Sequence, residues 1–206
     1  MNKLLLVLLI LCVWLSVNSC GKKDSPSTAT STTTGNSTET VFIYPYSTSA
    51  KDADVADSVV NTCHSTSSGY TYAPFYSTST HDLKDRLPSS KWSNPVYSLQ
   101  GHKISSSWEN LWDGNIDMSL HQAEVIYDNY STSSAASGGT GFWTGTKSDG
   151  TFSGNNCRDW SSSSSSDNVT WGSFLKMGSS LWIDNGTILC GGSSAYKKYF
   201  LCFMYN

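Results

Sequence analysis

The pattern of apolar and polar residues divides this chain of 206 residues into three segments. Residues 4–15 are apolar without interruption, whereas residues 21–40 contain no large apolar side chain. From Val41 onward, short apolar runs alternate with stretches rich in serine, threonine and glycine. This last segment is long enough for one domain with a buried core, so we expect the folded part to comprise residues 41–206.

The first segment has the features of a secretory signal peptide, which we assign to residues 1–19. One lysine precedes an apolar run of about a dozen residues, too short for the roughly 20 residues of a membrane span. Small residues follow, and the sequence at Cys20 resembles a bacterial lipobox, in which this cysteine becomes the lipidated first residue. Ordinary cleavage that leaves Cys20 as a thiol is the alternative.

The second segment, residues 20–40, is expected to be a flexible tether that starts at the lipidated cysteine. A segment of this composition cannot bury enough apolar surface to offset the entropy cost of ordering it. Together, the lipobox and the tether predict an exported protein that is anchored by lipid in the bacterial envelope, at the outer membrane or the cell surface. The membrane is therefore one expected partner.

Short runs rich in β-branched and aromatic residues predict the strands of the domain. They lie at residues 41–46, 69–76 and 95–99, and the strongest is the apolar run at 199–203. Pro45 indicates that the first strand ends there, at an exit or an edge. From Trp143 onward we expect further short strands joined by long polar loops, including a run of serines.

Two helices are expected in the front half of the domain. Small and apolar residues at three- and four-residue steps predict an amphipathic helix at residues 53–63, with its final cysteine on the buried face. Ser106 and Glu109 have the spacing of a capping box, which predicts a short second helix that ends at the Asp-Gly pair of residues 113–114. A single helical turn is expected at residues 82–87. Short helices followed by short strands predict an α+β domain.

The charge pattern excludes one class of ligand. The chain has 13 basic and 16 acidic residues, for a net charge of −3. Its arginines are Arg86 and Arg158, far apart in the sequence. A nucleic-acid-binding surface needs clustered lysine and arginine, so no nucleic-acid partner is expected.

The cysteines fit an oxidising compartment. Cys12 leaves with the signal peptide and Cys20 carries the lipid. The four that remain are Cys63, Cys157, Cys190 and Cys202. An even number in an exported chain predicts two disulfides, although spacing alone leaves three pairings open. The spacings are not those of a CxxC motif, which argues against zinc binding or redox chemistry.

Two motifs resemble the endostatin domain of basement-membrane collagens: the strand at residues 95–99 and the Ser-Trp-Glu helix at residues 107–114. Later positions follow in a similar order: Trp143, Gly145, Thr146, Asp149, Gly150, Cys157, Trp160, Cys190, Leu201 and Cys202. The resemblance covers residues 41–203. The chain is also similar to spirochaetal, leptospiral-type lipoproteins of unassigned function, which combine a lipobox, a Ser/Thr tether and such a domain.

This resemblance implies a C-type lectin-like fold, because endostatin is a variant of it. We therefore expect two short helices packed on mostly antiparallel strands with long loops. The family's disulfides are nested, which implies the pairs Cys63–Cys202 and Cys157–Cys190. Some endostatins bind heparin through surface arginines, but two arginines make heparin binding doubtful here.

Metal binding receives limited support. Some endostatins hold zinc through histidines near their N-terminus, but the histidines of this chain are scattered at His64, His81, His102 and His121. Sugar-binding C-type lectins hold Ca²⁺ with acidic and amide oxygens just before a cysteine. Asp184 and Asn185 precede Cys190 in this way, so they are the calcium candidates, although Asp-Asn-Gly is equally a turn sequence. We expect no cofactor besides this possible calcium ion.

Two further groups of residues are candidates for a catalytic or a binding site. His121 lies near Glu124, Asp113 and Asp117, which would form either an acid/base cluster or a solvated loop. The aromatic residues Tyr70, Tyr72, Phe75 and Tyr76 would, if exposed, form a binding patch. The tryptophans are expected in the core, and Trp108 and Trp112 are spaced to share one face of their helix.

These features predict a lipid-anchored envelope protein whose domain is a non-catalytic, adhesion-type binding module for a protein or glycan. One alternative is an envelope hydrolase with a site near His121 and Glu124. Another is a structural lipoprotein without a specific ligand.

Overall fold

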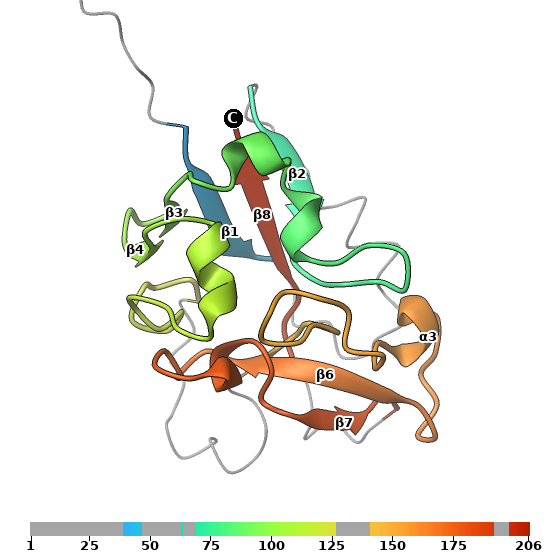
Figure 1. Ribbon diagram of the computed structural model, residues 1–206. Helices are drawn as coiled ribbons and strands as arrows, with labels where there is room; N and C mark the ends of the chain where they lie inside the picture. The colour runs from blue at the N-terminus through green and yellow to red at the C-terminus, as the bar shows by residue number, and fades with distance from the viewer. Residues whose placement is uncertain (1–38, 47–62, 64–68, 127–140, 192–197) are drawn as a thin grey trace, which may run out of the picture. The chain divides into compact units, whose positions relative to one another are not determined.

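The structure is a computed structural model that describes residues 39–46, 63, 69–126, 141–191 and 198–206 (Figure 1). All of them belong to one compact unit, Ser37–Asn206. The expected helix at residues 53–63 lies outside this set except for Cys63, which is buried. Within the described residues, no helix is long and apolar enough to cross a membrane.

A five-stranded sheet carries the domain, with the strand order β2-β8-β1-β3-β4. Its strands are β1 (Val41–Pro45), β2 (Thr71–Pro74), β3 (Val96–Ser98), β4 (Lys103–Ser105) and β8 (Leu201–Tyr205). β1 pairs in parallel with β3, and the other pairs are antiparallel. Figure 1 shows β8 between β1 and β2. The strands expected at residues 41–46, 69–76 and 95–99 are thus confirmed, although each is shorter than expected and β2 spans only half of its expected range.

Alternation along β1 fixes which face of this sheet is buried. Val41 and Ile43 are fully buried, whereas Phe42 between them is only half-buried. Because successive side chains of a strand point to opposite faces, Val41 and Ile43 define the inner face and Phe42 the outer face. β3 repeats the pattern, with Tyr97 half-buried between two buried residues.

A second sheet has three antiparallel strands in the order β5-β6-β7. They are β5 (Gly141–Trp143), β6 (Asn168–Ser173) and β7 (Thr187–Leu189). In the view of Figure 1, β6 runs across the direction of β8. The expectation of short strands and long loops after Trp143 is confirmed.

The described helices are short. They are the 3-10 turns η2 (Lys84–Arg86), η3 (Ser89–Lys91), η4 (Glu109–Asp113) and η6 (Ser180–Trp182), and the four-residue helix α3 (Cys157–Trp160). The turn expected at residues 82–87 is confirmed as η2. The domain is therefore α+β, with mostly strands, few helices and two disulfides.

The short helix after Ser106 forms as η4, and it ends where expected. Gly114 follows it with φ 91°, a left-handed conformation that glycine adopts without steric cost. The expected capping box is wrong, because the Oγ of Ser107 accepts from the backbone N–H of Asn110 at 3.1 Å. Glu109 instead donates its backbone N–H to the carbonyl of Trp92.

The larger core, which we call the first core, joins the inner face of the five-stranded sheet to η4 and the second sheet. Phe75 is fully buried at its centre. Its ring lies 6.0–6.4 Å from five others: Trp108, Trp112, Phe142, Trp182 and Phe203. Trp108 and Trp112 do share one face, with ring centroids 5.3 Å apart. Burying each large aromatic side chain contributes about 2–3 kcal/mol.

The smaller core, which we call the second core, contains every described cysteine. Cys63 bonds to Cys202 and Cys157 to Cys190, which are the pairs that the resemblance implies. The other buried members are Tyr76, Trp143, Trp160, Val169 and Phe200. This core is therefore crosslinked as well as packed.

Candidate functional site

A shallow groove lies on the outer face of the five-stranded sheet. It is lined by Thr40, Phe42, Pro95, Tyr97 and Gly101, and has a volume of about 340 Å³. This volume lies at the low end of the range of about 300–1,000 Å³ that is typical of small-molecule sites. The groove is open to solvent rather than enclosed, so it would hold part of a larger ligand.

Strand register brings the groove's aromatic residues together. Phe42 on β1 lies directly opposite Tyr97 on β3 and Met204 on β8. Met204 in turn lies opposite Tyr72 on β2. Residues opposite each other in paired strands share a face, so these four form a row across four strands, which we call the outer row. Each of them is half-buried.

A tight hairpin forms one wall of the groove. Gly101, with φ 85°, joins β3 to β4 and donates its N–H to the carbonyl of Ser98 at 3.0 Å. Ser98 closes the hairpin by donating to His102 at 2.9 Å. Because the hairpin is held by the backbone, the position of this wall does not depend on a mobile side chain.

A polar network holds the segment that enters β1 beside the groove. The ammonium group of Lys91 lies 2.9 Å from a carboxylate oxygen of Glu39 and donates to the backbone O of Asn206 at 2.6 Å. Thr40 donates its N–H to the side chain of Asn206. Hydrogen bonds from Lys91 and Asn94, with the charge of Lys91, lower the pKa of Glu39. These contacts place Thr40 at the rim of the groove.

A second exposed feature is the helix α3, which has an unusual backbone. All four of its residues have φ between 52° and 65°, the left-handed region that non-glycine residues rarely occupy. The turn is held at both ends, because Cys157 bonds to Cys190 and the indole N–H of Trp160 donates to Ser77 at 2.9 Å. Asn156 caps it by accepting from the N–H of Asp159.

Asp159 ties this turn to the segment after β2. Its carboxylate accepts from the backbone N–H of Ser79 at 2.6 Å and from the side-chain amide of Asn156 at 2.7 Å. Burial acts to raise the pKa of Asp159, but these bonds and that from the Ser79 hydroxyl outweigh it and hold the pKa below its ordinary value. Asp159 is therefore a structural residue.

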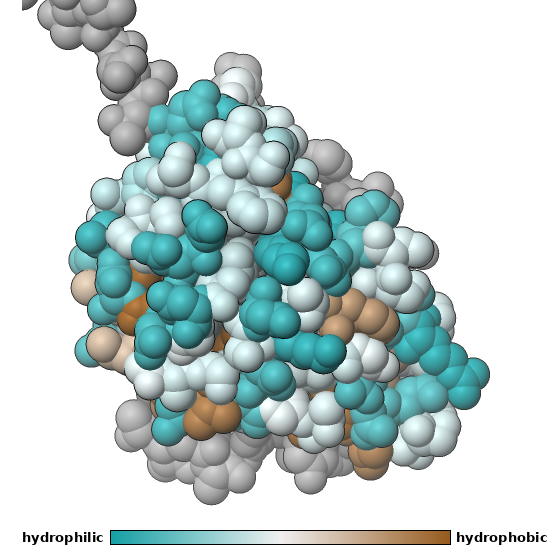
Figure 2. Space-filling view, in the orientation of Figure 1, coloured by the Kyte–Doolittle hydropathy of each residue, from teal (hydrophilic) through white to brown (hydrophobic). Residues whose placement is uncertain are grey.

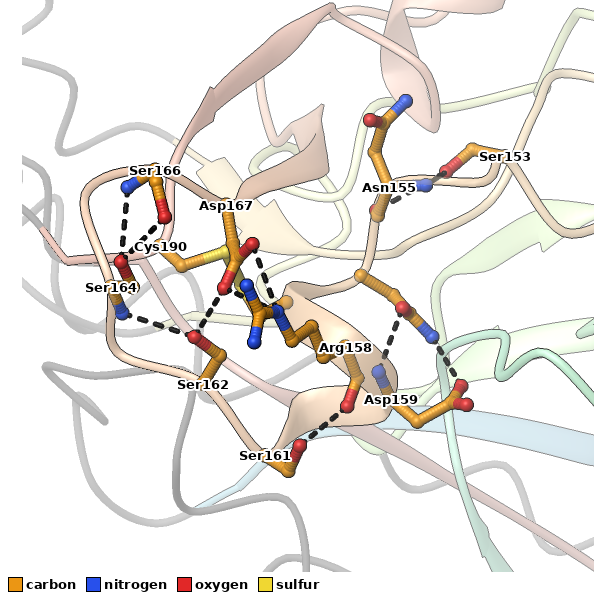
Figure 3. Close-up of a disulfide and its surroundings, with 12 residues drawn as sticks. Ser153, Asn155, Arg158, Asp159, Ser161, Ser162, Ser164, Ser166, Asp167 and Cys190 are labelled. Carbon is orange, nitrogen blue, oxygen red and sulfur yellow. Dashed lines mark hydrogen bonds and ion pairs between the residues drawn. A yellow bond between two sulfur atoms is a disulfide. The ribbon is translucent and has the colours of Figure 1, made fainter.

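The run of serines at residues 161–166 is an ordered loop next to this turn (Figure 3). Asp167 lies between Ser162 and Arg158, accepting from both, with Arg158 Nε at 3.0–3.1 Å. The hydrogen bond from Ser162, followed by that from Arg158, lowers the pKa of Asp167. Ser164 donates to Ser162 Oγ and accepts from Ser166. The loop thus satisfies its polar groups locally.

The calcium candidates lie in a turn. Asp184 accepts from the backbone N–H of Gly186, which has φ 113°, and Asn185 donates its N–H to Trp171 at 2.7 Å. Burial raises the pKa of Asp184. The positive charge of Lys147 lowers it, but by less than burial raises it. Within the described residues, no group of three or more His, Cys, Asp or Glu side chains is arranged to hold a metal ion.

The carboxylates near His121 do not converge on it. Glu124 lies 3.8 Å from His102, and Asp117 lies 3.5 Å from Lys103. Their side chains are about half exposed, and His121 and Asp113 are also exposed. Glu124 thus faces His102 and Asp117 faces Lys103, both on the β3–β4 hairpin, so the geometry fits the solvated loop rather than the acid/base cluster.

The expected aromatic patch is wrong for two of its four residues. Phe75 is fully buried in the first core, and Tyr76 is buried in the second. The reason is that the chain leaves β2 and passes between the two cores, so side chains on both sides of it are covered. Tyr70 and Tyr72 are half-buried. Tyr72 packs against the second core, and the Tyr70 ring contacts Phe42 edge-on at 6.2 Å. The candidate binding surface is therefore the groove with the outer row and not the expected patch.

One buried cation was not expected from the sequence. The ammonium group of Lys198 lies 3.9 Å from the centre of the Trp171 ring, and the side chain is 1% exposed. Burial lowers the pKa of Lys198 to about 8. The cation–π contact stabilises the charged form in this position.

Phe42 and Tyr97 were also not expected at a site. Each lies in a predicted strand, but their meeting depends on the parallel pairing of β1 with β3, which the sequence does not reveal. The face shown in Figure 2 is mostly hydrophilic or neutral, and its apolar residues appear as separate spots. Such scattered apolar residues are ordinary for a protein surface and indicate no ligand.

No protein-family model matches the chain, and no curated protein matches it. Cys20, His64 and residues 20–38 of the expected tether lie outside the described residues, so what was expected of them stays a prediction. The last two residues of that segment, Glu39 and Thr40, are held by Lys91 and Asn206.

Proposed function

We propose that this chain is a lipid-anchored bacterial envelope protein whose domain is a non-catalytic binding module for a protein or glycan. The observation that carries the proposal is the open groove lined by Phe42 and Tyr97 on a hydrogen-bonded sheet. Aromatic side chains fixed in this way supply contact area at low entropy cost. The lipobox at Cys20 and the polar tether support its display from a membrane.

We further propose that the domain has the C-type lectin-like fold that the resemblance to endostatin implies. Two observations support it. The disulfides are nested, since Cys157–Cys190 lies within the chain closed by Cys63–Cys202. The Ser-Trp-Glu motif forms η4 and buries Trp108 in the first core. An experimental structure with a different strand order would reject this assignment.

Anchoring is tested by labelling cells that express the chain with a radioactive fatty acid. Lipidation at Cys20 predicts a labelled protein that partitions with membranes, and a Cys20→Ser variant that is unlabelled. Addition of protease to intact cells then separates surface display from a periplasmic location. A wild-type chain that carries no label would reject the lipid anchor.

Binding is tested by applying the purified full-length chain, in detergent, to arrays of glycans and extracellular-matrix proteins, with and without calcium. The proposal predicts selective binding to at least one ligand. Loss of binding on substitution of Asp184 and Asn185, together with a calcium requirement, would assign the ligand to that turn. The absence of any selective ligand would reject a binding role.

A further inference from the structure

We infer that the outer row is a calcium-independent platform for an uncharged polysaccharide, whose sugar rings stack on Tyr97 and Phe42. This inference deepens the proposed function and rests on it. Its basis is the position, charge and spacing of the side chains on the outer face of the five-stranded sheet.

The aromatic side chains that line the groove are partly exposed, and the paired strands of the sheet hold their backbone in place. Phe42 and Tyr97 are half-buried in adjacent strands and line the groove together. The Tyr70 ring supports Phe42 from the side, at 6.2 Å. A sugar ring has one face made of C–H groups, and this face packs against an aromatic ring while its hydroxyl groups remain in water. A half-exposed ring of fixed orientation suits that contact.

The charge of the groove favours an uncharged ligand. All five lining residues are uncharged. The charged side chains nearest in the sheet are already paired, since Lys103 opposite Tyr97 faces Asp117 at 3.5 Å. Lys91 faces Glu39 at 2.9 Å. A sulfated or phosphorylated polymer would find no free cation here among the described residues.

The spacing of the row favours a polymer over a single sugar. Tyr97, Phe42, Met204 and Tyr72 lie on four consecutive strands, and neighbouring strands are about 4.8 Å apart. This step is close to the length of one sugar unit in an extended polysaccharide. A chain of sugars that crosses the strands would therefore place successive rings over successive members of the row, and the open groove lets it enter and leave.

The test uses the full-length chain in detergent and three soluble hexasaccharides of uncharged sugars: cellohexaose, laminarihexaose and mannohexaose. Calorimetric titration with EDTA present should show binding of at least one of them. Phe42→Ala and Tyr97→Ala should each weaken it about tenfold. Tyr97→Phe should retain it, because stacking needs the ring and not the hydroxyl. Leu189→Ala, which removes an exposed apolar side chain from β7 of the other sheet, is the matched control and should change nothing.

The outcomes separate this inference from the proposed function. Binding that Phe42→Ala and Tyr97→Ala leave unchanged, or that EDTA abolishes, would overturn the platform and leave a binding module. Selective binding of proteins or heparin on the arrays, without binding of any uncharged glycan, would also overturn the platform and leave a binding module. Absence of any ligand on the arrays would overturn both.

A second measurement covers the case in which an alanine variant fails to fold. Amide chemical shifts of the wild-type chain, recorded by NMR while the bound hexasaccharide is added, should change in β1, β3 and β8. Shifts confined to β6, β7 and the serine loop would overturn the inference. Near-ultraviolet circular dichroism establishes which variants are folded.

Discussion

The two cores of this domain differ in what holds them together. The first core consists of large apolar side chains around Phe75 and contains no described cysteine. The second core is smaller, includes all four disulfide cysteines, and borders the buried cation Lys198 next to Trp171. Where the chain buries enough apolar surface, packing suffices. Where long polar loops leave little apolar surface, covalent bonds replace it.

The largest effect should follow from removing the bond that closes most of the domain. Cys63 and Cys202 are 139 residues apart, and the loop-entropy model gives about 5 kcal/mol for such a crosslink. We expect the double variant Cys63→Ser/Cys202→Ser to lose about that much free energy of unfolding, measured by urea denaturation. A loss below about 1 kcal/mol would show that packing alone holds the second core.

Substitution in the first core should cost nearly as much without involving any disulfide. Trp108 is fully buried, and Trp108→Ala should reduce the free energy of unfolding by about 4 kcal/mol. The control is Trp92→Ala at the half-buried edge of this core, since both indoles donate to a backbone carbonyl. Equal losses for the two variants would contradict the assigned core.

The disulfide that closes the shorter loop should contribute less to the free energy of unfolding, and its removal should affect a smaller part of the domain. Cys157 and Cys190 are 33 residues apart, which corresponds to about 3.5 kcal/mol. In the double variant Cys157→Ser/Cys190→Ser, hydrogen exchange should speed up at the amides of Cys190 and Gly191, which bond to Asp167 and Ser164. Amides of β1 and β3 should keep their protection, and equal acceleration there would refute the separation of the two cores.

A smaller effect is expected where the second sheet meets the first core. A methyl group added at Gly172 would lie 2.5 Å from the carbonyl of Trp182 and 2.6 Å from the Phe142 ring. Gly172→Ala should therefore reduce the free energy of unfolding by about 2 kcal/mol. Gly178→Ala, which adds its methyl group in open space, is the control in thermal denaturation.

The smallest effect concerns pH and the buried lysine. The pKa of Lys198 is about 8 in the folded chain and about 10.4 when unfolded, so between these values the unfolded chain binds more protons. Stability should therefore rise as pH rises through this window, because the folded chain has already released a proton that the unfolded chain still binds. Lys198→Met should remove this rise in urea denaturation at pH 7 to 10. An unchanged rise would assign it to other groups.

The sequence predicted those elements whose signals are local. The β-rich runs predicted β1, β2 and β3, and the Asp113-Gly114 pair predicted the end of η4. The left-handed turn at residues 157–160 was not predicted, because it depends on Cys190, Ser77 and Ser79, all distant in the sequence. The capping box failed for a different reason: the serine one position later provides the hydrogen bond.

The sequence predicted the type of residue at the candidate site but not which residues form it. Aromatic residues at the surface were expected, but Phe75 and Tyr76 proved to be buried, and Tyr97 and Phe42 take their place. An aromatic residue in a short strand points to one of two faces, and only the pairing of strands decides which face is covered. Periodicity cannot supply this information, because β1 and β3 are far apart in the sequence and pair in parallel.

The position of β8 has a consequence for how this chain reaches its folded form. The last strand of the domain lies inside the sheet, between β1 and β2, and carries Cys202, the partner of Cys63. A chain that is synthesised from its N-terminus onward delivers this strand last. The sheet and the long-range disulfide therefore remain incomplete until β8 has been synthesised, so neither can be completed while the chain is still emerging.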